Sequence, residues 1–186
     1  MPRKSVSPRK KRPVRTSLAI HRHWLSRAED IARRPPGHGG SPHPTVKVGA
    51  ILVDRHGHEI AGAANRFAHG VDRKRPERYI DGVKSLWISC AEQIVIASAL
   101  RARADIDGAS LYLTLEPCAI CAGFIAELRL REVFVPVGAM RRYAKLKDKW
   151  KTSIEVGLIK LAEAGVPLTA IDMGPPAKKR RRRNAR

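Results

Sequence analysis

The sequence predicts an α/β protein with a mixed sheet and helices on both faces. Two observations support this class. An apolar, β-branched stretch at 45–54 is followed by a short polar segment at 55–59 and a second apolar stretch at 60–65, a pattern typical of a β-hairpin. After residue 90, strand-like and helix-like segments alternate, which favours parallel strands joined by helices. The hairpin adds antiparallel strands, so the sheet is expected to be mixed.

Each expected element has a signal of its own. Apolar residues spaced three or four apart predict a helix over 17–34, with Ser17 as its cap and Pro35-Pro36 at its end. A loop then leads into the hairpin, and a charged connection at 66–85 follows it. The later elements are expected to be a helix at 90–103, a strand at 110–116, a helix at 117–130, a strand at 132–137, a helix at 152–165 and a strand at 166–172.

The 186-residue chain has the length of one domain with a sizeable core, and we expect that domain to span residues 16–173. Residues 1–15 and 174–186 are expected to be disordered basic tails, because they are too polar to bury apolar surface. They hold fourteen of the 37 Lys and Arg residues and none of the 17 acids, so the middle carries only +6 of the net +20. Such tails suit non-specific nucleic-acid contact, a solubilising role or, in a eukaryote, nuclear import.

Cysteine usage and hydropathy bear on location. Three cysteines suit no closed disulfide framework, which favours a reducing compartment. No apolar stretch approaches the ~20 residues that cross a bilayer, and none follows the basic N-terminus as a secretory signal would. We therefore expect a cytoplasmic protein, or a nuclear one if the source is eukaryotic, with no membrane partner.

Cys118 and Cys121 lie three residues apart at the start of a predicted helix, directly after Pro117. Residues at this spacing share a helical face, and the free N–H groups of a first turn favour thiolates. The pair therefore fits half of a zinc site. A redox pair and two small buried residues are equally open interpretations of this motif alone.

Cys90 favours the metal interpretation, because it also starts a predicted helix and would complete a three-thiolate site. Three protein ligands leave the fourth position of a tetrahedral zinc for water, as in catalytic sites. Glu92 then has two interpretations. It can form a capping box with Ser89, or it can move protons between that water and a substrate nitrogen.

Together, Cys90-Ala91-Glu92 and Pro117-Cys118-Ala119-Ile120-Cys121 resemble the motifs of the cytidine deaminase superfamily, in particular the cytidine and deoxycytidylate deaminases. The resemblance extends over about residues 45–137 and more weakly to 173. Deoxycytidylate and tRNA-adenosine members usually have His-Ala-Glu, whereas nucleoside members have Cys-Ala-Glu. The segment at 62–72 also looks like the deoxycytidylate deaminase segment Gly-x-Asn-Gly-x-Pro-x-Gly.

The resemblance implies a three-layer α/β/α sandwich with a mixed sheet of about five strands, one zinc ion per chain, and hydrolytic release of ammonia. It implies that Cys90, Cys118 and Cys121 are the zinc ligands and that Glu92 is the catalytic proton shuttle. It further implies that Asn65 binds the sugar of the substrate and that the Ala91 backbone binds the base. Family members are commonly homo-oligomers, so a homo-oligomer is expected.

The chain departs from the deoxycytidylate pattern at Cys90, at Arg66 and at Ala68, where that pattern has histidine, glycine and proline. Three thiolates and Zn²⁺ sum to −1, so the metal would polarise its water less than a His-Cys-Cys site does. Arg66 is a candidate to compensate this charge. A solvated loop arginine is the alternative.

Three functions remain open from the sequence. The first is deamination of a small cytosine nucleotide or nucleoside, of the dCMP or cytidine type. The basic residues after Asn65 would then contact a phosphate or be solvated; they are Arg66, His69, Arg73, Lys74, Arg75 and Arg78. The second is deamination of a base within tRNA or another nucleic acid. The third is a non-catalytic, zinc-stabilised nucleic-acid-binding module, which predicts a fourth protein ligand.

Overall fold

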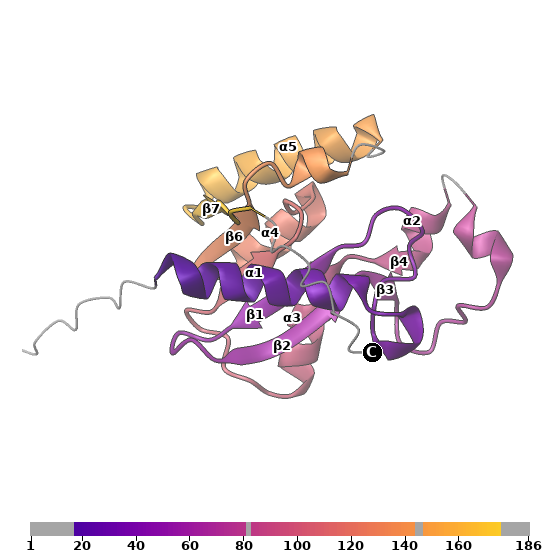
Figure 1. Ribbon diagram of the computed structural model, residues 1–186, viewed down its shortest axis with the longest axis horizontal. Coiled ribbons are helices and arrows are strands. Elements are labelled where there is room, and N and C mark those ends of the chain that lie inside the picture. The colour runs from indigo at the N-terminus through magenta and orange to yellow at the C-terminus, as the bar shows by residue number, and fades with distance from the viewer. Residues whose placement is uncertain (1–16, 81–82, 144–146, 176–186) are drawn as a thin grey trace, which may run out of the picture.

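A five-stranded mixed sheet forms the middle layer of the computed structural model, which describes residues 17–80, 83–143 and 147–175 (Figure 1). The strand order is β2-β1-β5-β6-β7. The bounds are Gly49–Val53 for β1, Glu59–Ala64 for β2, Ser110–Leu113 for β5, Glu132–Pro136 for β6 and Leu168–Ile171 for β7. β1 is antiparallel to both β2 and β5, whereas β5, β6 and β7 run parallel. The predicted mixed sheet is confirmed.

Helices cover both faces of the sheet, which completes the predicted three-layer sandwich. α1 (Leu18–Arg33) crosses one face and contacts all five strands; Figure 1 shows it in front of the sheet. α3 (Ala91–Arg101), α4 (Ala119–Glu127) and α5 (Asp148–Glu163) lie on the other face, with α5 packed against α4. No helix in the described part of the chain has the length and hydropathy of a membrane-spanning segment.

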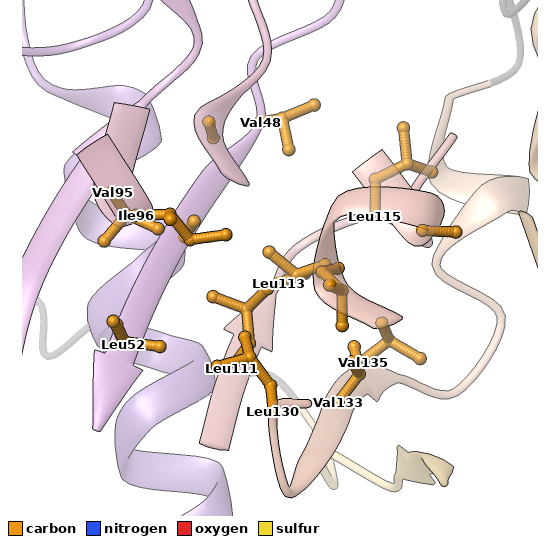
Figure 2. Close-up of a cluster of buried hydrophobic side chains, with 14 of the residues drawn as sticks. Val48, Leu52, Val95, Ile96, Leu111, Leu113, Leu115, Leu130, Val133 and Val135 are labelled. Carbon is orange, nitrogen blue, oxygen red and sulfur yellow. The ribbon is translucent and has the colours of Figure 1, made fainter. Parts of the chain in front are cut away.

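Two hydrophobic cores result from the alternation of strand side chains. In β1, Ile51 and Val53 pack with α1, whereas Ala50 and Leu52 belong to the core under α3, α4 and α5. Successive strand residues point to opposite faces, so a strand between two helical layers must be apolar on both. Figure 2 shows the larger core, where Leu52 lies with side chains from the neighbouring strands and α3.

The connection between β2 and α3 is more structured than its charged sequence predicts. It contains β3 (Arg66–Phe67), the 3-10 turn η2 (Pro76–Tyr79), the one-turn helix α2 (Lys84–Trp87) and β4 (Ile88–Ser89). β3 pairs antiparallel with β4, which places Arg66 opposite Ser89. Two-residue strands have no sequence periodicity to reveal them, yet this pairing holds the residues after Asn65 beside the start of α3.

Several boundaries differ from those predicted. α4 begins at Ala119 rather than residue 117, because Cys118 is its N-cap. α5 begins at Asp148, four residues earlier than predicted, and therefore includes Lys149 and Trp150. Two further 3-10 turns, η1 (Pro36–His38) and η3 (Met140–Arg142), lie in connections. Apart from residues 174 and 175, the predicted disordered tails lie outside the described residues.

Candidate active site

The three cysteines of the chain meet at the N-termini of two helices. The sulfur atoms of Cys90, Cys118 and Cys121 all lie within 4.8 Å of one another. Cys90 is the N-cap of α3, Cys118 is the N-cap of α4, and Cys121 is the third residue of α4. Tetrahedral zinc holds its sulfurs about 2.3 Å from the metal and therefore about 3.8 Å apart. The cluster fits that ion with small adjustments of the side chains.

In the described part of the chain, no histidine or carboxylate joins this group of donor atoms. All three thiols are free of disulfides, and the two on α4 are buried. A metal bound here would keep one coordination position for a non-protein ligand, which is the arrangement of catalytic rather than structural zinc sites.

The surroundings favour a thiolate at Cys118, whereas hydrogen bonding to Cys118 and burial raise the pKa values of Cys90 and Cys121. Hydrogen bonds from the Cys121 and Cys90 thiols to the Cys118 sulfur lower the pKa of Cys118. The N-termini of α3 and α4 add the positive ends of two helix dipoles. These partial charges offset part of the negative charge that three thiolates would bring to one metal.

Glu92 is the second residue of α3, beside the cysteines, and only 4% of its surface is exposed. Burial raises the pKa of its carboxyl group to about 7, and the nearby Cys118 adds to the increase. A carboxyl group with a pKa near neutrality can both accept and return a proton. A bound cation would lower this pKa, because it favours the charged form.

The predicted capping box between Ser89 and Glu92 is wrong. The helix begins one residue later than that interpretation requires, with Cys90 as N-cap, and the Gln93 side-chain oxygen accepts the hydrogen bond of the Cys90 amide at 3.2 Å. Gln93, not Glu92, therefore completes the capping box at the start of α3. The Glu92 carboxyl group instead accepts hydrogen bonds from its own backbone amide and from the Cys121 thiol, and Glu92 lines the pocket described below.

A pocket adjoins the cysteine cluster, and its wall includes Cys90, Cys118, Glu92, Ala91 and Asn65. Apolar side chains form much of the rest of the wall; they are Val46, Val48, Ile88, Leu115, Trp150 and Ile154. The remaining lining is polar or charged and comprises His43, Lys84, Ser85, Ser89, Glu116, Lys147 and Lys149. An apolar pocket with a few convergent polar groups is typical of small-molecule sites.

Asn65 is 6% exposed and lines the pocket, but its side chain is already hydrogen-bonded. Its Oδ1 accepts from the Val48 amide at 2.9 Å, and its Nδ2 donates to the Val46 carbonyl at 3.0 Å. One Nδ2 hydrogen and one Oδ1 lone pair remain available to a ligand. Asn65 therefore holds the backbone segment that leads into β1. This role is additional to its predicted contact with a sugar.

Arg66 lies opposite Ser89, yet it does not line the pocket. Its Nη1 donates to the Phe67 carbonyl at 3.4 Å. Among the described residues it makes no hydrogen bond to a cysteine sulfur. The charge compensation predicted for Arg66 finds no support in this geometry.

His43 is a pocket residue that the sequence did not point to. Its Nδ1 accepts hydrogen bonds from the backbone amides of Thr45 and Val46, at 3.2 and 2.9 Å. The neutral ring therefore carries its proton on Nε2. His43 precedes Cys90 by 47 residues and belongs to no motif, so only the folded loop reveals its position.

A family model described as the cytidine and deoxycytidylate deaminase zinc-binding region matches residues 20–137, well over half of the chain. An uncharacterized deaminase in the luxG 3'region of Aliivibrio fischeri is 28% identical over 131 residues, which is 69% of this chain and 82% of that protein. Residues 20–137, which the family model matches, include all three cysteines and Glu92.

Two tRNA-specific adenosine deaminases are also similar over shorter segments. The Rickettsia bellii protein is 33% identical over 91 residues, which is 48% of this chain and 54% of the relative. The Bacillus subtilis protein is 37% identical over 90 residues, which is 47% of each chain. The matches thus span about half of these two enzymes.

A solved structure of dCMP deaminase from the cyanophage S-TIM5, in complex with dCMP and dUMP, has the same fold. The TM-score is 0.60 at 20% identity, with 83% of this chain and 98% of that chain covered. Both the shared architecture and the family match agree with the cysteine cluster at two helix N-termini. The chain belongs to the family of the cytidine and deoxycytidylate deaminase zinc-binding region and is a zinc-dependent hydrolytic deaminase.

Proposed function

We propose that this enzyme deaminates a cytosine nucleotide or nucleoside, with Cys90, Cys118 and Cys121 holding one zinc ion and Glu92 moving the protons. One observation carries the proposal: three sulfurs lie within 4.8 Å of one another, and two of the cysteines, Cys90 and Cys118, line a pocket together with Glu92, whose buried carboxyl group has a raised pKa. Bound zinc supplies Lewis-acid activation of the attacking water.

Glu92 would transfer protons in both halves of the reaction. Its carboxylate accepts a proton from the water that forms a C–O bond at the amine-bearing ring carbon, and passes it to the ring nitrogen. It then moves the remaining hydroxyl proton to the exocyclic amine as the C–N bond breaks. Ammonia leaves and the ring carbon keeps the oxygen, so water is the only co-reactant.

One backbone amide would orient the base, and one side chain would orient the sugar. Ala91 is the first residue of α3, so its amide is one that the helix itself cannot pair, and it lines the pocket. We assign it a hydrogen bond to the base. Asn65 would use its remaining Nδ2 hydrogen on the sugar.

Arg66 does not contact the cysteines, so it could offset the −1 charge of the site only by Coulombic attraction over a longer distance. Replacing it with alanine tests this role. A lower zinc affinity or turnover in Arg66→Ala would support it, and unchanged values would refute it.

A base within a tRNA is the second candidate substrate, because the two relatives named as tRNA-specific adenosine deaminases exceed 30% identity. A panel separates the candidates. Ammonia release is measured from dCMP, cytidine, deoxycytidine and an adenosine-containing tRNA stem-loop. Turnover of a free cytosine compound supports the first candidate, and turnover of the stem-loop alone overturns it. Removing residues 1–15 and 176–186 should reduce turnover only of a polymeric substrate.

A further inference from the structure

We infer that a hollow on the face of the sheet that carries α1 binds a small zwitterion, a molecule with one carboxylate and one ammonium group on a short apolar body, such as a free amino acid. Arg131 pairs with the carboxylate of this ligand and Glu132 with its ammonium group. The inference is independent of the proposed function, because the cysteine cluster lies on the opposite face of the sheet.

Three parallel strands and one helix form the hollow, which has a volume of about 250 Å³. His21, near the start of α1, lies over its floor. The floor consists of the side chains of β5, β6 and β7 that point towards α1; they are Ser110, Tyr112, Glu132, Phe134, Thr169 and Ile171. Ser110 and Glu132 begin their strands, whereas Cys118 follows the other end of β5. The hollow and the cysteine pocket therefore lie at opposite edges of the sheet as well as on opposite faces.

Two opposite charges line the hollow without pairing with each other. Glu132 is half-buried, and its Oε1 accepts a hydrogen bond from the Thr169 hydroxyl at 2.7 Å. Arg131 is exposed. Neither of the two forms an ion pair with any residue in 17–80, 83–143 and 147–175, and the Arg131 side chain makes no hydrogen bond there. Separate charges of opposite sign are complementary to a ligand that carries both signs.

Both charges act on the same group of the hollow. Burial raises the pKa of Tyr112 to about 12, Glu132 adds to this increase, and Arg131 opposes it. The Glu132 carboxylate and the Arg131 guanidinium therefore both lie within electrostatic reach of the Tyr112 hydroxyl. They flank one space rather than two separate parts of the surface.

The other polar side chains of the hollow carry no charge at neutral pH. Burial lowers the pKa of His21, although Glu132 opposes this effect, so the imidazole is neutral. The His21 Nδ1 and the Tyr112 hydroxyl form a hydrogen bond of 3.1 Å. The Phe134 ring lies 4.2 Å from the His21 ring and 4.7 Å from the Tyr112 ring, between their centres. An aromatic wall thus accompanies the two charges.

A zwitterion fits this lining better than an ion of one sign. A simple anion would be repelled by Glu132, and a simple cation would be repelled by Arg131. The planar guanidinium of arginine can bind a carboxylate through two hydrogen bonds, and a carboxylate accepts strong hydrogen bonds from an ammonium group. A cavity of about 150 Å³ is enough for benzene, so the hollow has room for a molecule of amino-acid size.

Binding of leucine tests the site against two analogues that each lack one charge. NMR titration of the zinc-loaded full-length protein compares leucine with 3-methylbutylamine, which lacks the carboxylate, and with 4-methylpentanoate, which lacks the ammonium group. We expect leucine to bind about tenfold or more tightly than either analogue, the size of effect that one charge-assisted hydrogen bond provides.

Two variants assign each ligand charge to its partner. Arg131→Met should weaken the binding of leucine about tenfold and should not weaken that of 3-methylbutylamine, which has no carboxylate to lose a partner. Glu132→Gln should weaken leucine and 3-methylbutylamine but not 4-methylpentanoate. The glutamine can still accept the hydrogen bond of Thr169, so the strand pairing is preserved.

Arg129→Met is the matched control, because it removes an exposed arginine two residues before Arg131 that does not line the hollow. It should leave the affinity for leucine unchanged. Circular dichroism and zinc content confirm that each variant is folded. The site would be overturned by an absence of leucine binding, by equal affinity for leucine and one of its analogues, or by equal weakening in Arg131→Met and Arg129→Met. Ammonia release plays no part in this measurement, so its outcome does not depend on the proposed function.

Discussion

At the scale of single residues, a shift of one position in the helix start decides what Glu92 does. Ser89 and Glu92 match a capping box in sequence, but Cys90 occupies the N-cap and Gln93 closes the box. Burial makes ionisation of a carboxyl group costly, and the hydrogen bonds that Glu92 receives from its own amide and from the Cys121 thiol leave its pKa raised. Glu92 is therefore better explained by chemistry than by helix stability.

Replacing Glu92 with glutamine tests that explanation. Glu92→Gln keeps the side-chain volume but cannot accept and return a proton, so turnover should fall about 10²- to 10⁴-fold while zinc content stays near one per chain. Ammonia release and metal analysis measure the two quantities. Gln93→Ala is the matched control: it should lower the unfolding free energy by about 0.5–1.5 kcal/mol and retain turnover. Undiminished turnover in Glu92→Gln would disprove the proton-transfer role.

Asn65 provides a second prediction at this scale. In Asn65→Ala, the buried Val48 amide and the half-buried Val46 carbonyl lose their partners, which should lower the unfolding free energy by about 1–3 kcal/mol. Urea denaturation measures this change. A loss of substrate affinity with unaltered stability would instead mean that Asn65 serves the ligand alone.

At the scale of elements, α5 positions the turn that carries Cys118. The Ser153 hydroxyl accepts a hydrogen bond from the Ala119 amide at 3.2 Å, so a residue of α5 satisfies the first turn of α4. Gly157 lets α5 approach closely, because a Cβ at this position would lie 2.5 Å from the Pro117 carbonyl oxygen. α5 therefore packs directly against the turn that carries Cys118.

A methyl group at Gly157 should disturb the metal site from a distance. Gly157→Ala must displace either α5 or the turn at Pro117, which should cost about 1–3 kcal/mol of stability and weaken zinc binding. Gly123→Ala is the control, since the nearest tertiary neighbour of its Cβ would be the Lys160 ammonium at 3.7 Å. Competition with a zinc-binding dye measures affinity. Equal zinc affinity in the two variants would contradict the coupling of α5 to the site.

At the scale of the whole molecule, the cysteine cluster joins α3 to α4, two helices on the same face of the sheet. A metal that binds only the folded chain stabilises it by mass action, by about 2.7 kcal/mol when free zinc is a hundredfold above its Kd. Bound zinc should therefore hold the N-terminal ends of α3 and α4 together.

Removal of zinc with a chelator should abolish turnover and lower Tm by several degrees, and added zinc should restore both. Differential scanning calorimetry of the metal-free and zinc-loaded protein measures the shift. The same Tm in both forms would show that the cluster does not hold a metal that contributes to folding.

The sequence alone was enough to predict the mixed sheet, the layered fold and the reaction class, because these depend on local signals. Apolar periodicity predicts strands and helices, and the spacing of Cys118 and Cys121 puts both on one face of a helix. The order Cys-Ala-Glu followed by Pro-Cys-x-x-Cys is local as well, and the match over residues 20–137 supports the family it indicates.

The tertiary structure alone decided what surrounds that chemistry. The positions of His43, Lys84, Lys147 and Lys149 around one pocket depend on how distant loops and the start of α5 fold back, and no spacing along the chain encodes this. The start of a helix likewise depends on which of two neighbouring residues becomes the N-cap. Here Cys90 is the N-cap, so Gln93 rather than Glu92 completes the capping box of α3. Local residue order thus determined the reaction, whereas long-range packing determined which substrate groups the pocket can meet.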